Sequence, residues 1–197
     1  DAPALLGLFE PDHMQYEQDR PKDRAGEPSL AELTRAAIAN LSKHQEGFVL
    51  MVEGARIDHA NHSGNAARAL GDTIAMSDAV KAAVDATSAE DTLIIVTADH
   101  SHTLNFVGYP ARGNAILGKV KDKGGEDGMG ALDLARDGMG MPYTTLSYAN
   151  GPGYTGASNQ QPAGPKRFPH GPSSFEAANG RPDLTHVDTE HPDYMQE

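Results

Sequence analysis

Two short apolar runs decide the fold that this sequence predicts: Phe48-Val49-Leu50-Met51-Val52 and Thr92-Leu93-Ile94-Ile95-Val96-Thr97. A continuous apolar run of this length is typical of a strand that is buried on both faces of a parallel sheet. Between the two runs, residues 65–86 carry apolar side chains at helical spacing. A strand, a long helix and a second strand in this order predict a βαβ unit.

The flanking sequence predicts helix before this unit and irregular structure after it. Ser29-Leu30-Ala31-Glu32 has the pattern of a capping box, and we expect its helix to run to about Lys43. Residues 108–180 hold 15 of the 21 glycines, and Tyr143 to Tyr148 is a candidate strand there. We therefore expect an α/β fold, part of a mostly parallel sheet flanked by helices, over residues 1–107. A Gly/Pro-rich irregular insertion would fill 108–185, and 186–197 would return to the core.

The bulk composition narrows the function. The chain has 197 residues, of which 38% are hydrophobic and 22% charged, as in globular proteins. Its formal net charge of -12 argues against nucleic acid as a partner, because phosphate backbones attract concentrated Lys and Arg. There is no cysteine, so a zinc site would need His and carboxylate ligands. No apolar run approaches the roughly 20 residues of a membrane-spanning helix.

The start of the chain predicts a longer product. The first residue is Asp1 rather than Met, and no signal-peptide pattern follows it. We expect the chain to begin inside a longer protein, as a processed or truncated piece.

Polar clusters follow both predicted strands, at the sheet edge where α/β proteins bind ligands. Asp58 and His62 are four residues apart, so one helical turn or a tight loop would present both to one ion. Carboxylate and imidazole together suit Zn²⁺, whereas a separate Glu with water suits Mg²⁺. Two zinc ions about 4 Å apart can stabilise the attacking and leaving oxygens of phosphoryl transfer. The alternative interpretation is that these clusters are ordinary polar residues on the protein surface. The two clusters comprise Glu53, Asp58, His59 and His62, and then Asp99, His100 and His102.

At these clusters the sequence resembles the alkaline phosphatase family. The stretch from Val52 to His62, VEGARIDHANH, is similar to that family's VEGxxIDxxxH segment, and Thr97 to His102, TADHSH, is similar to its TADHxH segment. Further similarity lies at LGLFEP, GYPARG, NGPGY and GRPD, so the resemblance covers nearly the whole chain and is weakest from about Lys119 to Met141. It implies an alkaline-phosphatase-like fold with a crown-like insertion at 108–185.

The resemblance also implies a role for each residue of the clusters. Glu53 would bind Mg²⁺, Asp58 and His62 would bind the first Zn²⁺, and Asp99 and His100 would bind the second. His102 would orient Asp58 from outside the metal's own ligands. His59 would lie near the substrate phosphate and contact it through water.

A calcium site is a further implication of the resemblance. Some members hold Ca²⁺ near a Phe-Glu pair and an acid that precedes Pro-Ser-Leu. Phe9, Glu10 and Glu27 are the candidates, since Glu27 precedes Pro28-Ser29-Leu30. The alternative is that Glu10 and Glu27 are ordinary surface acids.

The activity implied for the complete enzyme is hydrolysis of phosphate monoesters through a phosphoserine intermediate. The motifs of the family's Ser nucleophile, its phosphate-binding Arg and its last zinc-ligand His are not found in these residues. We therefore expect the chain alone to be inactive and to pair with a second copy or with the missing half. Family habit implies a periplasmic or secreted homodimer. The alternatives are a related phosphodiesterase, sulfatase or phosphonate hydrolase, and a non-catalytic metal-binding or assembly module.

Overall fold

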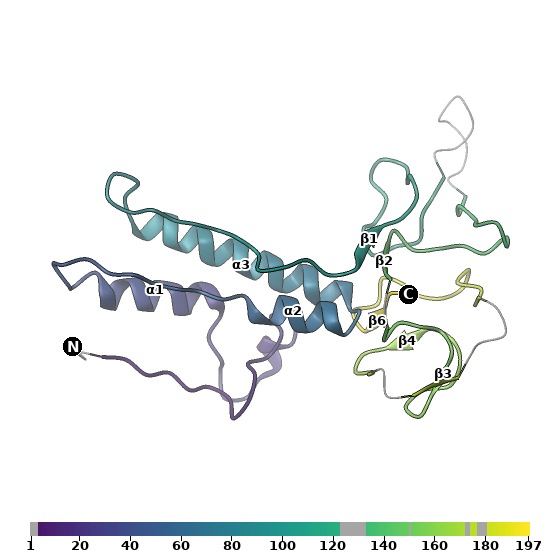
Figure 1. Ribbon diagram of the computed structural model, residues 1–197, viewed down its shortest axis with the longest axis horizontal. Helices are drawn as coiled ribbons and strands as arrows, with labels where there is room; N and C mark the ends of the chain where they lie inside the picture. Colours follow the sequence, from purple (N-terminus) through teal and green to yellow (C-terminus); the bar gives the residue numbers. More distant parts are fainter. Residues whose placement is uncertain (1–3, 123–132, 150, 172–173, 177–180) are drawn as a thin grey trace. The chain divides into compact units, whose positions relative to one another are not determined.

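The computed structural model describes residues 4–122, 133–149, 151–171, 174–176 and 181–197 (Figure 1). The chain divides into two compact units. Unit 1 contains residues 1–58 and 68–100, and unit 2 contains 59–67 and 101–197. The boundaries predicted at 107/108 and 185/186 stay a prediction. Residues 123–132 and 177–180 of the predicted insertion lie outside the described residues, as do Asn150 and Gly180 of its motifs.

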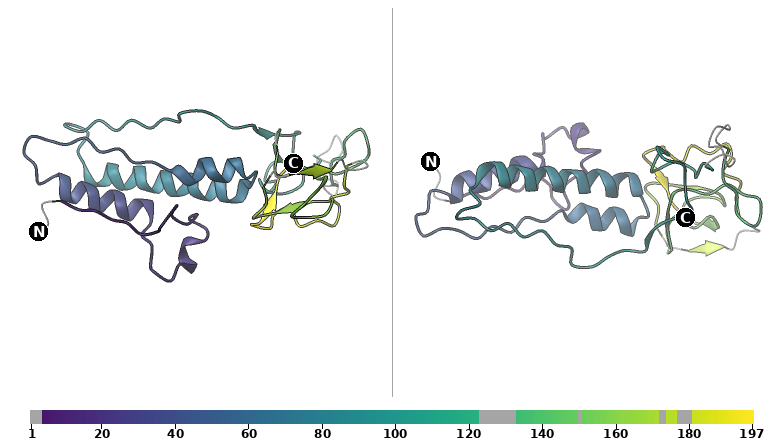
Figure 2. Two further views of the ribbon diagram at one scale, coloured as in Figure 1. Left: turned by 60° about the horizontal axis from the view of Figure 1, so that its bottom comes forward. Right: turned by 90° about the horizontal axis from the view of Figure 1, so that it is seen from above.

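Unit 1 is built on helices. A single 3-10 turn, η1 (Arg20–Lys22), precedes α1 (Leu30–Leu41), and α3 (Ala66–Ala86) lies beside α1 in both views of Figure 2. The predicted capping box is confirmed: the Ser29 side chain accepts from the backbone N–H of Glu32, whose carboxylate accepts from the N–H of Ser29. Alanines on α3, among them Ala69, Ala79 and Ala82, are buried in the core.

The two predicted strands of the parallel sheet are not strands in this structure. Residues 48–52 and 92–97 are extended and run in the same direction, back toward the N-terminal end of α3 (Figure 1), but neither is assigned to a sheet. Val49 is 96% exposed and Ile95 is 77% exposed. Strand stability comes from cross-strand pairs and from burial of both faces. The described part of the chain supplies neither to these segments, so they run in the same direction, as predicted, without the predicted strand pairing.

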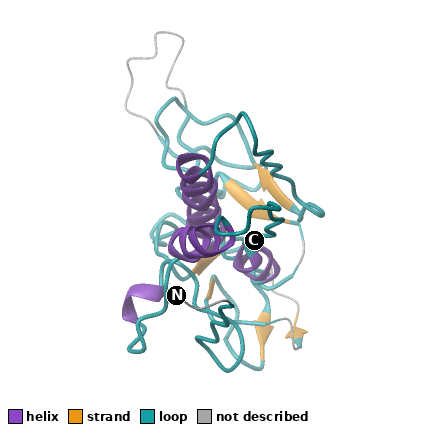
Figure 3. Ribbon diagram, turned by 90° about the vertical axis from the view of Figure 1, so that its left-hand side faces the viewer, coloured by secondary structure: helices purple, strands orange, loops and turns teal. Residues whose placement is uncertain are grey.

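Unit 2 contains all the described strands, which Figure 3 marks in orange. They form three antiparallel pairs. In the first pair, Leu104 opposes Tyr148 and Phe106 opposes Leu146, so the strand expected within 143–148 is confirmed over its second half. The pairs are β1 (Leu104–Phe106) with β2 (Leu146–Tyr148), β3 (Ala157–Ser158) with β5 (Phe175–Glu176), and β4 (Lys166–Arg167) with β6 (Tyr194–Met195).

The segment after α2 (Ala55–His62) is tied to the end of the described chain within unit 2. Gly64 has a φ of 63°, the left-handed conformation that commonly ends a helix. Its carbonyl accepts from the N–H of Gln196 at 2.9 Å, and the Gln196 side chain accepts from the N–H of Ala66 at 3.0 Å. The Asn65 amide donates to the carbonyl of Tyr194 at 3.2 Å. These bonds fix the C-terminal side of α2.

Candidate metal centre

Three of the predicted ligands meet in unit 1. Asp58 lies in the first turn of α2, and Asp99 and His100 end the second extended segment. His100 Nε2 is 3.6 Å from Asp58 Oδ1 and 3.3 Å from Asp99 Oδ2. The structure brings these three side chains close together, and their role as metal ligands stays a prediction.

The separation between Asp99 and His100 fits two ligands of one zinc ion. Zinc bonds to nitrogen or oxygen of about 2.0–2.2 Å in a tetrahedron place neighbouring donor atoms about 3.4 Å apart. The distance of 3.3 Å between His100 Nε2 and Asp99 Oδ2 is close to that value. Asp58, Asp99 and His100 all reach solvent, so an ion could enter without unfolding the unit. A carboxylate and an imidazole are both ligands that suit Zn²⁺.

Glu53, the predicted magnesium ligand, stands apart from this grouping. It is exposed, one residue after the first extended segment. Within the described ranges, Glu53 belongs to no group of three or more closely spaced metal-ligating side chains. Its predicted role stays a prediction.

The three predicted site histidines of unit 2, His59, His62 and His102, occupy α2 and the segment before β1. The rings of His62 and His102 lie edge to face, with centroids 4.9 Å apart. His59 is half-buried, one turn of helix before Ser63, whose N–H donates to its carbonyl at 3.0 Å. Next to His62, the Asn61 side chain accepts from the Tyr148 hydroxyl at 2.6 Å. The roles predicted for His59, His62 and His102 stay predictions.

A second acidic group contains two of the three predicted calcium residues. Carboxylate oxygens of Glu10, Asp23 and Glu27 lie within 4.8 Å of one another in unit 1, while Phe9 is 41% exposed. Glu27 also accepts from the N–H of Gln15, and Asp23 accepts from the N–H of Glu27. The sequence interpretation missed Asp23, although its position four residues before Glu27 was an available signal.

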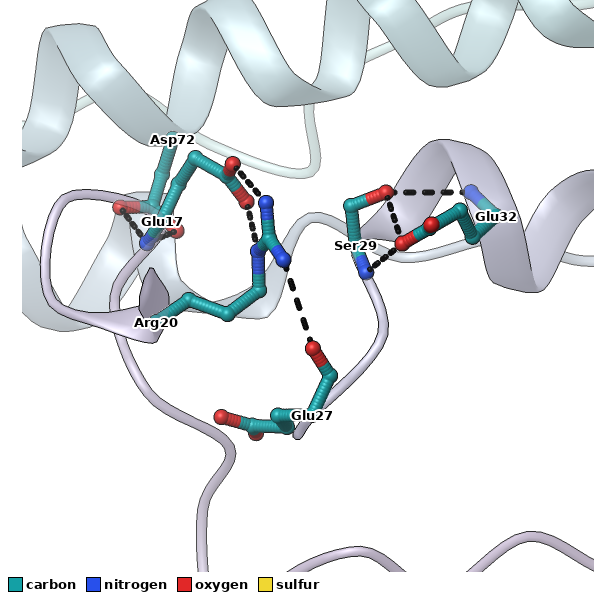
Figure 4. Close-up of polar contacts among 6 residues, drawn as sticks. All are labelled: Glu17, Arg20, Glu27, Ser29, Glu32 and Asp72. Atoms are coloured by element: carbon teal, nitrogen blue, oxygen red, sulfur yellow. Dashed lines mark hydrogen bonds and ion pairs between the residues drawn. The ribbon is translucent and has the colours of Figure 1, made fainter. Parts of the chain in front are cut away.

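The loop that carries Glu27 is held by a polar network, shown in Figure 4. The Arg20 guanidinium donates to both carboxylate oxygens of Glu17, at 2.8 and 2.7 Å, and to the carbonyl of Glu27 at 3.4 Å. The N–H of Glu17 donates to the carboxylate of Asp72 on α3 at 3.3 Å. Burial raises the pKa of Asp72 to about 6, against the opposing effects of this N–H and of the Arg56 charge.

Comparison with known proteins identifies the family to which this chain is similar. The family model described as alkaline phosphatase matches residues 1–182. The chain is 48% identical over 149 residues to the membrane-bound alkaline phosphatase of Bombyx mori, covering 76% of this chain and 24% of the relative. It is 47% and 45% identical over 150 residues to the tissue-nonspecific isozymes of Felis catus and Homo sapiens, covering 76% of this chain and 26% of each relative.

The comparisons also show how much of its relatives' length the chain covers. It spans about a quarter of the length of the curated relatives that it matches. Among the described residues, no helix has the length and apolar character needed to cross a bilayer. The matched region contains both clusters of predicted metal ligands, and membership implies an α/β fold. The chain belongs to the alkaline phosphatase family.

Proposed function

We propose that this chain is part of an enzyme that hydrolyses phosphate monoesters, and that it supplies most of the metal ligands of the site. The observation that carries the proposal is the close approach of Asp58 and Asp99 to His100 in a member of the alkaline phosphatase family.

Each ligand has a proposed role. Asp58 and His62 hold one zinc from one face of α2, Asp99 and His100 hold the second, and Glu53 holds magnesium. The metals, when bound, polarise the phosphate and stabilise the charge on the attacking and leaving oxygens. His102 orients Asp58, and His59 contacts the substrate phosphate through water.

The chain alone provides an incomplete site. With these assignments each zinc has two protein ligands from these residues, whereas a zinc site usually has three or four. The chain covers 24–26% of its relatives, so the serine nucleophile and the remaining ligands would come from the rest of a longer protein. We propose that the complete enzyme works through a phosphoserine, as a periplasmic or secreted homodimer.

Calcium is the proposed occupant of the second acidic group. Glu10, Asp23 and Glu27 supply carboxylate oxygens, the ligands that Ca²⁺ prefers, and Phe9 neighbours them in sequence. We expect terbium, a luminescent stand-in for Ca²⁺, to bind the unaltered chain and to bind Glu27→Gln at least about tenfold more weakly. Equal terbium binding by the two proteins would mean that Glu10 and Glu27 are ordinary surface acids and not calcium ligands.

Two assays on the same preparations test the proposed function. Zinc and magnesium content is measured on the 197-residue chain, beside hydrolysis of p-nitrophenyl phosphate at alkaline pH. The same assays are run on the complete reading frame that encodes it. We expect weak zinc retention and no turnover from the chain, and zinc-dependent turnover from the complete protein that Asp99→Asn abolishes.

The outcomes separate the candidate functions. Turnover by the chain alone, lost in Asp99→Asn, would mean that it carries its own nucleophile. Preference of the complete protein for phosphodiesters, sulfate esters or phosphonates would assign it to a related hydrolase class. If the complete protein binds zinc but hydrolyses none of these substrates, its function would be that of a non-catalytic metal-binding or assembly module.

A further inference from the structure

Helix α2 carries the two proposed ligands of one zinc, and each has a neighbour in sequence that contacts a buried tyrosine. Within unit 1, the Arg56 guanidinium lies 3.8 Å from the centre of the Tyr16 ring. Within unit 2, the Tyr148 hydroxyl donates to Asn61 Oδ1 at 2.6 Å. Arg56 is two residues before Asp58, and Asn61 is the residue before His62. The two contacts therefore hold the two ends of α2.

The Tyr16 ring is a fixed support. Tyr16 is 5% exposed, and its carbonyl accepts from the N–H groups of Asp19 and Arg20, both at 2.8 Å. The preceding N–H, of Gln15, donates to Glu27, and the following N–H, of Glu17, donates to Asp72. A ring with its backbone held on both sides cannot follow a moving guanidinium, so it restrains Arg56.

A guanidinium over an aromatic face is attracted by the ring quadrupole. Arg56 also lies close enough to the Asp72 carboxylate for its charge to lower the pKa of that group. The aromatic contact adds to this attraction in fixing the first turn of α2.

The Tyr148 contact works through its hydroxyl instead. Tyr148 is 4% exposed on β2, its N–H donates to the carbonyl of Glu197 at 2.7 Å, and burial raises the pKa of its hydroxyl. The hydroxyl therefore stays protonated and donates to Asn61. This bond fixes the last turn of α2, where His62 lies.

From these contacts we infer that Tyr16 and Tyr148 are positioning residues for Asp58 and His62, Tyr16 through its ring and Tyr148 through its hydroxyl. The inference rests on the proposed function, because it takes Asp58 and His62 as zinc ligands. Groups that orient metal ligands from outside typically change metal affinity by about 10–100-fold.

Tyr16 is proposed to act through its ring and Tyr148 through its hydroxyl, so substitution by Phe should affect the two positions differently. Zinc affinity is measured by competition with a chelator on the 197-residue chain, and the visible absorption of bound Co²⁺ is recorded as a reporter of ligand geometry. We expect Tyr16→Leu to weaken zinc binding at least about tenfold and Tyr16→Phe to keep it, whereas Tyr148→Phe should weaken it at least about tenfold. The Co²⁺ spectrum should change in the two weakened variants.

Controls separate this inference from a folding defect and from the proposed function. Tyr109→Leu and Tyr109→Phe are matched exposed substitutions, since Tyr109 is 88% exposed, and far-ultraviolet circular dichroism reports the helices. Asp58→Asn tests the ligand itself. If Asp58→Asn weakens zinc binding while Tyr16→Leu and Tyr148→Phe do not, the positioning roles are wrong and the proposed function stands. If Asp58→Asn has no effect, both are wrong.

A fold-wide effect would look different. If Tyr16→Phe loses affinity as fully as Tyr16→Leu, the ring is not what holds Arg56, and the Tyr16 role is overturned. Arg56→Gln offers an independent check, because it removes the cation and leaves Tyr16 in place. It should reproduce the loss of Tyr16→Leu, and unchanged affinity would overturn the contact as a positioning device.

Discussion

Asp72 is a buried carboxylate whose ionisation opposes folding. Its pKa is raised from 3.8 to about 6 in the folded chain, chiefly by burial. The folded state then binds more protons than the unfolded state between these values, so the free energy of unfolding falls as pH rises from 3.8 to about 6. The loss amounts to about 2–3 kcal/mol at neutral pH.

The corresponding variant is Asp72→Asn, whose amide oxygen can still accept from Glu17. We expect it to lack this fall and to be more stable than the unaltered chain above pH 6, by about 1–2 kcal/mol after loss of the attraction to Arg56. Urea unfolding at a series of pH values measures the difference. Asp85→Asn, at an exposed pair with Lys81, is the control and should change little. Parallel pH profiles for Asp72→Asn and the unaltered chain would contradict the account.

Gly153 is a position in unit 2 where an added side chain would collide with backbone. A Cβ there would collide with the carbonyl oxygen of Gln196, a backbone atom that also belongs to the segment bonded to Gly64 and Ala66. We expect Gly153→Ala to lower the stability of unit 2 by about 2 kcal/mol or more, because backbone must shift. Thermal unfolding measures it, with Gly138→Ala as the control, since a Cβ at Gly138 meets no atom within 4 Å. Equal losses in both variants would show that the close approach does not matter.

At the scale of the element, α1 is the clearest case of a helix specified locally. Ser29 accepts from the N–H of Glu32 at 3.2 Å, and Glu32 Oε2 accepts from the N–H of Ser29 at 2.7 Å. We expect Ser29→Ala to cost about 1 kcal/mol of unfolding free energy. Ser42→Ala, at the other end of α1 where the cap bonds are made by the backbone, should be nearly neutral. The midpoints of urea unfolding compare the stability of the two variants. Equal destabilisation by both would show that the capping box does not stabilise α1.

At the scale of the whole molecule, the two extended segments expose apolar side chains and backbone that a sheet would cover. Val49, Met51, Leu93 and Ile95 are each more than three-quarters exposed. Unpaired extended segments of this kind attract other strands. We expect the isolated chain to self-associate with rising concentration. Val49→Lys with Ile95→Lys should reduce this, because charged residues block pairing between edges.

Sedimentation velocity measures the association. The control is Val84→Lys, at an exposed apolar residue of α3 that offers no strand edge. Self-association that survives the double variant, or that is equally reduced by Val84→Lys, would place the contact elsewhere.

The sequence by itself determined what depends on near neighbours in the chain. The Ser29–Glu32 cap, α3 and the helical turn that presents Asp58 and His62 follow from i+3 and i+4 spacing, and family membership follows from the two motifs. Contacts between residues that are distant in the sequence were decided only by the tertiary structure. Asp23 joining Glu10, Tyr16 beneath Arg56 and Tyr148 on Asn61 need folded geometry. The absent ladder at 48–52 and 92–97 has the same cause: apolar content predicts a strand, but a strand exists only where a partner pairs with it.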